Sequence, residues 1–350
     1  MTNKFFIKIN LKTYKMNYLK LMFIMIMIMS TMITLNSSSW LNSWMGLEIN
    51  LMSFLPLMMN FSKSIKLSNS MMIYFMIQAS ASSILLMMIL LMKMELIINN
   101  FWLLNILQLS ILMKLGASPF HWWITKVTLN IDWINMFLLL TWQKIAPLFI
   151  LLMINFNSMI YIFSLFSVIS GAILGLNQSM IKLMLTYSSI NQLGWMLMIL
   201  NLNLMLLIIY LIIYSLINLM ICLNFKLNNL VYLNQLIKNN NFNIYNKIIC
   251  LSLFLSLAGL PPLLGFLPKL FSLIIMIKNN LIFESFLFSI MSIISLSFYM
   301  NPLMSMMLIN KINNKWKLNN FLLNNIYLNI IMINLLMSLI IFILFMFYFF

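Results

Sequence analysis

Four ionisable side chains occur in long apolar stretches of this sequence, where a charge is costly. They are Glu48, Lys114, Lys144 and Lys269, each set among Leu, Ile, Met and Phe. A lysine near the middle of a bilayer costs about 2.5–3.5 kcal/mol on insertion scales, so a chain that keeps one there has a use for it. Burial disfavours the charged amine and a nearby carboxylate favours it, so such groups can load and unload a proton. The pattern predicts a proton relay inside a membrane protein.

Simpler interpretations of these residues stay open. A lysine can snorkel, with its stem in hydrocarbon and its ammonium group at the interface. Snorkelling fits Lys269 better than Lys144, because Lys144 lies far from either end of its apolar stretch. Glu48 is too short to snorkel, and its alternative role is a structural ion pair with one of the lysines.

Two of the charged stretches contain helix-breaking residues close to the lysine. The breaks are predicted at Gly116, Pro119, Pro261, Pro262 and Gly265, in KLGASPFHWW and in GLPPLLGFLPK at residues 259–269. Irregular backbone at membrane depth is tolerated only where it is buried in protein or lines a wet cavity. Unwound turns also offer backbone groups and room for water, which suits proton transfer.

Two further residues have both a plain and a functional interpretation. His121 is the sole histidine and stands before two tryptophans, as an interfacial anchor does, but it could also admit protons. Lys182 lies at a helix start, where it is either a topology-setting charge or an auxiliary proton carrier.

The composition indicates an all-α integral membrane protein. Of the 350 residues 64% are hydrophobic and 7% charged, against roughly 25% charged in a soluble domain. Only 7 Gly and 7 Pro interrupt the chain, too few for the turns of a β-barrel. No Gly-x-Gly-x-x-Gly or Walker sequence occurs, and Cys222 and Cys250 lack the spacing of an iron–sulfur or zinc site. We therefore expect no metal and no redox centre on this chain.

Hydropathy predicts about eleven transmembrane helices after a basic leader at residues 1–17. The spans are 18–35, 40–59, 70–92, 101–120, 133–153 with a kink at Pro147, 159–176, 183–200, 204–223, 248–277, 281–300 and 326–348. The fourth and ninth spans carry the breaks, five spans apart. This spacing predicts two inverted five-helix repeats, 18–154 and 155–301, followed by a polar loop and last helix at 302–350.

The lysines are distributed unevenly between the two predicted faces. Of the 20 lysines, 15 fall in the leader and alternate loops when Lys20, at the start of the first span, is counted with the leader; 2 fall in the opposite loops and 3 in the other spans. Positive charge accumulates on the inner side, so the N-terminus is predicted inside and the C-terminus outside.

The residue usage suggests a mitochondrial genome. All basic residues are Lys, Met reaches 37, and Asn, Ile and Phe are abundant, as A/T-rich codons and a code that reads ATA as Met would produce. This points to a mitochondrial genome of an invertebrate kind. A Met-rich adaptable core is the alternative explanation.

Several distinctive strings resemble the antiporter-like membrane subunits of mitochondrial NADH:ubiquinone oxidoreductase, respiratory complex I. They are WMGLEIN at 44–50, KLGASPFHWW at 114–123, TWQKIAP at 141–147, GLNQ and YSSINQLGW between 175 and 195, and GLPPLLGFLPK at 259–269. The resemblance implies eleven helices, with key groups at positions that here are Glu48, Lys114, Lys144 and Lys269. It implies NADH, FMN, iron–sulfur clusters and ubiquinone on other subunits. It also implies subunits 4L and 4 as neighbours, lipids such as cardiolipin, and the mitochondrial inner membrane, with no nucleic acid bound.

The chain departs from that family at three places. Gln192 stands where relatives commonly carry a histidine, a basic pair is reduced to Lys182 and Leu183, and the leader is longer than expected. The resemblance favours a subunit that contributes to proton translocation. A free-standing cation/proton antiporter and a non-pumping scaffold of the membrane arm remain alternatives.

Overall fold

The computed structural model describes residues 2–59, 65–94, 100–154, 158–233, 235, 244–261 and 263–309. Within these ranges the regular elements are α-helices, and the β pairing is an isolated bridge between Met180 and Tyr232. This agrees with the predicted all-α class. The helices form two compact units, one from Met1–Gly116, Trp122–Asn135 and Trp142–Met159, and the other from Ala117–His121, Met136–Thr141 and the chain from Ile160 on.

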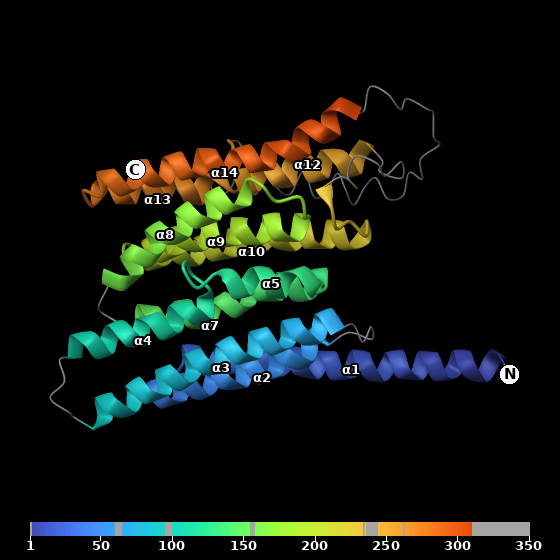
Figure 1. Ribbon diagram of the computed structural model, residues 1–350, viewed down its shortest axis with the longest axis horizontal. Coiled ribbons are helices and arrows are strands. Elements are labelled where there is room, and N and C mark those ends of the chain that lie inside the picture. Colours follow the sequence, from blue (N-terminus) through green and yellow to red (C-terminus); the bar gives the residue numbers. More distant parts are fainter. Residues whose placement is uncertain are drawn as a thin grey trace. The chain divides into compact units, whose positions relative to one another are not determined.

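The first unit is built on helices α1 to α5 and α7, which Figure 1 shows in blue to green, while most of α6 belongs to the second unit. Their bounds are α1 Thr2–Leu35, α2 Trp40–Met58, α3 Ile65–Lys93, α4 Asn100–Leu115, α5 Trp122–Asn130, α6 Trp133–Leu140 and α7 Trp142–Leu152. Helix α2 packs between α1 and α3, α3 also packs against both α4 and α5, and α7 contacts α1, α2 and α4. The chain therefore brings α2, α4 and α7, which carry three of the four charged residues, into one bundle.

Helix α1 contains the first predicted span. Residues Tyr18–Leu35 are long and apolar enough to cross a membrane, as predicted. The backbone is helical from Thr2, so residues of the predicted leader continue the same helix. The turn after Leu35 leads directly to Ser39, whose hydroxyl accepts a hydrogen bond from the amide of Asn42 and caps α2.

Helix α2 is more polar than a typical spanning helix. It follows the predicted span closely, yet it is not among the six described helices that are long and apolar enough to cross a membrane. Glu48 lowers its hydropathy, as do the buried side chains Ser43, Asn50 and Ser53. Neighbouring helices cover these polar groups, so contacts within the protein stabilise α2. A hydropathy criterion alone therefore does not identify α2 as a membrane span.

The fourth span is broken near its middle, and the predicted end at Phe120 is wrong. Helix α4 stops at Leu115 and α5 resumes at Trp122, after a glycine at φ 68°. Gly116 adopts a left-handed conformation that other residues reach only with strain, which ends α4. Because Trp122–Asn130 is helical again, the break is internal to the span.

The α-helix of the fifth span is interrupted at Thr141, six residues before the predicted kink at Pro147. Pro147 lies inside α7, and the interruption between α6 and α7 falls at Thr141. The Thr141 hydroxyl donates to the Phe137 carbonyl at 2.7 Å, a bond that tends to bend helices. Pro147 lacks an N–H and its ring crowds the preceding turn, so the distortion lies on the N-terminal side of the proline.

The second unit contains helices α8 to α14. They are α8 Ser158–Gly175, α9 Ile181–Leu200, α10 Leu204–Leu227, α12 Ile244–Ala258, α13 Phe266–Lys278 and α14 Ile282–Ile309. Helix α9 contacts α10, α13 and α14 and is buried almost along its whole length. A helix that is buried on all sides lies in the core of its bundle.

The break in the ninth span is shorter than predicted. Helix α12 ends at Ala258, Gly259 has a φ of 82°, and α13 begins at Phe266. Pro261 lies in the break and Gly265 directly precedes α13. Lys269 was predicted at the end of the break, but it belongs to the first turn and a half of α13 because Pro268 is tolerated near a helix start.

Six described helices meet the criteria of length and hydropathy for a membrane span, and three shorter helices are apolar. The chain is thus a multi-pass membrane-type protein, while the count of eleven stays a prediction. Pro262, the loop at 310–325 and the predicted last span at 326–348 lie outside the described residues.

Candidate functional site

Three of the predicted relay residues lie in the first unit. Glu48 is on α2, Lys114 in the last turn of α4 and Lys144 on α7. Lys114 and Lys144 are only 6% and 3% exposed, and Lys269 in the second unit is 6% exposed. A snorkelling lysine would keep its head group accessible, so burial to this degree places all three amines inside the protein.

Glu48 acts electrostatically on Lys114. A carboxylate and an ammonium group attract each other, and Glu48 is the charged side chain that influences Lys114. The Glu48 Oε1 atom is buried and has no hydrogen-bond partner among the described residues, and no direct salt bridge joins the two side chains.

The end of α4 beside Lys114 is closed by side chains from two other helices. The Gly116 amide and the Trp123 indole Nε1 donate to the Met113 carbonyl at 3.1 and 3.2 Å. Gln78 Nε2 on α3 donates to the Lys114 carbonyl at 3.2 Å. These donors satisfy carbonyls that would otherwise be orphaned, so the break is held in a defined conformation.

A hydrogen bond connects the helix of Glu48 to the helix of Lys144. Gln143 Nε2 on α7 donates to Asn50 Oδ1 on α2 at 3.0 Å and contacts Met27 Sδ on α1 at 3.4 Å. Asn50 is two residues from Glu48, and Gln143 directly precedes Lys144. This bond fixes the register of the two helices that carry the charges.

In the second unit Lys269 reaches back to the end of the preceding half-helix. Its Nζ donates to the carbonyls of Ala258 and Leu257 at 2.8 and 3.3 Å. The last carbonyls of a helix are unsatisfied and carry partial negative charge, so they bind a cation well. A Cβ on Gly259 would lie 3.0 Å from Lys269 Nζ, so the glycine leaves room for the amine.

The two auxiliary candidates occupy different environments. His121 lies between α4 and α5, half-buried, with its ring centroid 6.4 Å from that of Tyr187 and with Nδ1 unbonded. Lys182 is in the first turn of α9, beside the bridge that joins Met180 to Tyr232. His121 therefore lies within the broken span and not beyond it, while the roles of both residues stay predictions.

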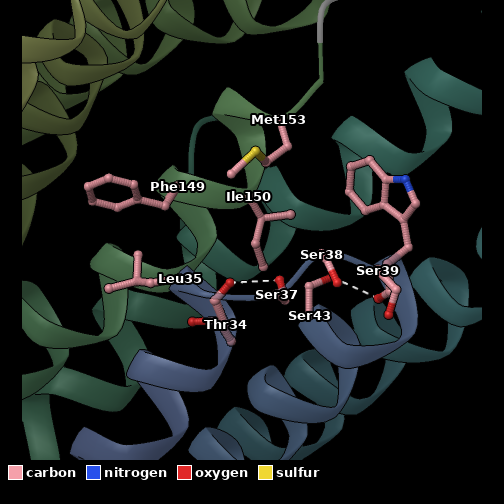
Figure 2. A pocket seen from close by; sticks show the side chains of 10 residues that line it. Thr34, Leu35, Ser37, Ser38, Ser39, Ser43, Phe149, Ile150 and Met153 are labelled. Atoms are coloured by element: carbon pink, nitrogen blue, oxygen red, sulfur yellow. Dashed lines mark hydrogen bonds between the residues drawn. The ribbon is translucent and has the colours of Figure 1, made fainter.

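A polar pocket lies at the turn between α1 and α2, and Figure 2 shows it from close by. Its volume is about 220 Å³, and hydroxyl groups of Thr34, Ser37, Ser38, Ser39 and Ser43 contribute to its wall. The α7 residues in the wall are apolar, and none of the residues in the wall is ionisable. The pocket is thus separate from the charged residues.

Metal-binding side chains are not grouped in the described ranges. No cluster of three or more His, Cys, Asp and Glu occurs there, and Cys222 and Cys250 are buried free thiols. Cys250 Sγ accepts a hydrogen bond from Asn224 at 3.3 Å, as an uncharged structural thiol does.

The sequence matches a known family over most of its length. Residues 37–295 match the family described as NADH:quinone oxidoreductase/Mrp antiporter, TM. The chain belongs to this family. Among its relatives, the NADH-ubiquinone oxidoreductase chain 2 of Anopheles gambiae is 41% identical over 85% of this chain and 89% of its own length. The protein of the same name in Aedes aegypti is 39% identical over the same shares, and that of Locusta migratoria is 34% identical.

Solved structures share the fold of this family. A chain of respiratory complex I from Thermus thermophilus aligns with a TM-score of 0.78 at 19% identity, over 92% of this chain and 78% of its own. A chain of the Mrp complex from Dietzia aligns with a TM-score of 0.74 at 15% identity, over 81% and 59%. The fold agreement extends beyond the residues that carry the sequence motifs.

Sequence reasoning missed two side chains that bond carbonyls at the first break. Gln78 and Trp123 carry no charge, and their role depends on the distant carbonyls of Lys114 and Met113. Gln192 was singled out as a departure from the family, but its bonds to Tyr210 and to the Leu257 carbonyl were not predicted. Gln78 could have been singled out from the sequence, because it is an amide in an otherwise largely apolar helix.

Proposed function

We propose that this chain is a membrane-arm subunit of mitochondrial NADH:ubiquinone oxidoreductase, and that it contributes to proton translocation through Glu48, Lys114, Lys144 and Lys269. The observation that carries the proposal is the burial of three lysine amines, two of them at the C-terminal ends of broken half-helices. Family membership and the named relatives supply the context.

The geometry suggests how each residue would act. Glu48 would stabilise the loaded form of Lys114 by charge, and the α12 carbonyls would do the same for Lys269. Lys144, on a helix whose register is fixed to α2, would be the next proton carrier after Lys114 in the first unit. Ordered water would connect them, because broken helices provide backbone groups and space at membrane depth. His121 and Lys182 are proposed as entry or auxiliary groups.

The proposal includes a topology and partners. It has eleven spans in two inverted repeats, in the mitochondrial inner membrane, with the N-terminus on the matrix side and the C-terminus in the intermembrane space. Its partners would be the other membrane-arm subunits, especially 4L and 4, and lipids such as cardiolipin. NADH, FMN, iron–sulfur clusters and ubiquinone would be bound by other chains.

The substitution Lys144→Met tests the proposal, because methionine keeps the length and removes the proton site. We expect the Lys144→Met complex to assemble. In vesicles reconstituted with it, fewer protons should be moved per NADH oxidised. Lys126→Met is the matched control, since Lys126 is exposed and lies 5.0 Å from the Trp122 ring. Unchanged pumping by an assembled Lys144→Met complex would instead favour the scaffold role.

The fold likeness to a chain of the Mrp complex keeps the free-standing antiporter as a second candidate. Mild detergent extraction separates the two. The proposed subunit should copurify with NADH-oxidising activity, whereas a chain that runs alone and exchanges cations for protons would support the antiporter.

A further inference from the structure

A chain of buried hydrogen bonds in the second unit ends at the same carbonyl that Lys269 binds. Tyr210 on α10 donates its hydroxyl to Gln192 Oε1 on α9. Gln192 Nε2 donates to the Leu257 carbonyl at 3.4 Å, and Lys269 Nζ donates to it at 3.3 Å. Tyr210, Gln192 and Lys269 are 2%, 5% and 6% exposed. One carbonyl at the break therefore has two donors, of which one is neutral and one titratable.

The Tyr210 hydroxyl and the Leu257 carbonyl together hold the Gln192 amide in one orientation, with Tyr210 bound to its oxygen. A glutamine amide has an oxygen that accepts and a nitrogen that donates, and rotation by half a turn exchanges them. The Tyr210 hydroxyl has a single proton to donate, and it donates that proton to Oε1. The NH₂ group is thereby directed to the Leu257 carbonyl, which only accepts.

The second donor matters when Lys269 changes charge. The final carbonyls of α12 have no helical partner, so a charged Lys269 is held there strongly. If Lys269 were the sole donor to the Leu257 carbonyl, loss of the lysine proton would weaken the hydrogen bond of this buried acceptor. A poorly paired buried acceptor costs free energy. Because Gln192 also donates to the Leu257 carbonyl, this carbonyl keeps a hydrogen bond in both protonation states of Lys269.

We propose that Tyr210 is a positioning residue for proton release from Lys269, acting through Gln192. In the step it assists, a proton passes from the Nζ ammonium to a water molecule, and the amine keeps the bonding electron pair. This inference rests on the proposed function and deepens it, since it assigns a means of release to one lysine of the relay. It also gives the neutral Gln192 a role that needs no titration of its own.

The predicted inverted repeat allows Gln192 in the second unit to be compared with Glu48 in the first. It pairs the second span with the seventh, so Gln192 occupies in its unit the helix that Glu48 occupies in the first. Glu48 acts on its lysine by charge. Gln192 acts instead on the Leu257 carbonyl, the acceptor that it shares with Lys269. This sharing weakens the binding of the charged Lys269 amine at the break.

The test is the pH dependence of proton pumping by the assembled complex carrying Tyr210→Phe, in vesicles supplied with NADH and a quinone. Phenylalanine keeps the ring and removes the hydroxyl. We expect the midpoint of the pumping profile to move to higher pH by about 0.5–1 unit, the size of one hydrogen bond, because Lys269 holds its proton more tightly. Tyr299→Phe is the matched control: Tyr299 is equally buried and its hydroxyl interacts with Ser188 on the same α9, and its midpoint should not move.

A double substitution shows whether Tyr210 acts through Gln192. Gln192→Met should shift the midpoint in the same direction, and Tyr210→Phe should add nothing in that background. Additive shifts, or an unmoved midpoint in Tyr210→Phe, would overturn the inference. If Tyr210→Phe does not assemble, Gln192→Met alone decides, and an unmoved midpoint there overturns it.

Lys269→Met separates this inference from the proposed function. Lost pumping in Lys269→Met together with an unmoved midpoint in Tyr210→Phe would reject the positioning role and leave the relay standing. Unchanged pumping in Lys269→Met would reject Lys269 as a relay residue, and the positioning role with it.

Discussion

Replacement of Gly116 by alanine should destabilise the first break more than any other single methyl group would. Gly116 has a φ of 68°, and an added Cβ would overlap Ile124 and lie 3.2 Å from Trp123 Nε1. The left-handed conformation costs an alanine about 1–2 kcal/mol and overpacking about 1–3 kcal/mol, so we expect about 2–5 kcal/mol in total. Displacement of Trp123 would also weaken its bond to the Met113 carbonyl.

The loss should be visible as a lower amount of assembled complex and as earlier thermal inactivation of NADH-driven proton pumping. A destabilisation of only about 1–2 kcal/mol already changes the cellular level of a protein several-fold. Native gel electrophoresis of mitochondria measures the first quantity, and the half-life of pumping on heating measures the second.

Gly175→Ala is the matched control, because it adds the same methyl group to a helical glycine. Its Cβ would meet the Phe298 ring at 3.0 Å, whereas its backbone is helical and needs no left-handed conformation. We expect a small effect there. Equal behaviour of the two variants would refute the reasoning from the left-handed conformation.

Three further substitutions probe the first unit. Gln78→Leu removes the donor to the Lys114 carbonyl and should cost about 1–3 kcal/mol, seen as reduced thermal stability of the complex; full stability would mean that another group satisfies the carbonyl. Glu48→Gln keeps the shape of the side chain and removes its charge, so proton yield per NADH should fall while assembly stays intact; an unchanged yield contradicts the relay. Gln143→Leu breaks the bond to Asn50 and should lower pumping less than Lys144→Met does, with loss of assembly as the contrary result.

Several features of the fold could be read from the chain because they depend on local chemistry. The bounds of most helices follow from apolar runs flanked by polar residues, as where α2 begins after Ser39 and α10 begins after Asn203. The breaks were located because glycine tolerates positive φ and proline lacks an N–H. The charged residues were found because charge in an apolar run is costly.

Other features were misplaced because they depend on groups far along the chain. The fourth span resumes at Trp122 because the carbonyls on the other side of its break receive donors from α3 and α5. No local pattern predicts where such donors come from.

The sequence by itself thus determined that this is an all-helical membrane protein. It also identified the four ionisable residues in apolar segments and the places where two helices break. The tertiary structure decided what those residues touch. Lys114 meets the field of Glu48 while Lys269 binds the end of α12 beside Gln192, although both appear in the sequence as a lysine near a break. The physical reason is that burial cost and backbone conformation are properties of short segments. The partner of an orphaned carbonyl or a buried amine is set by packing between helices that are far apart in the chain.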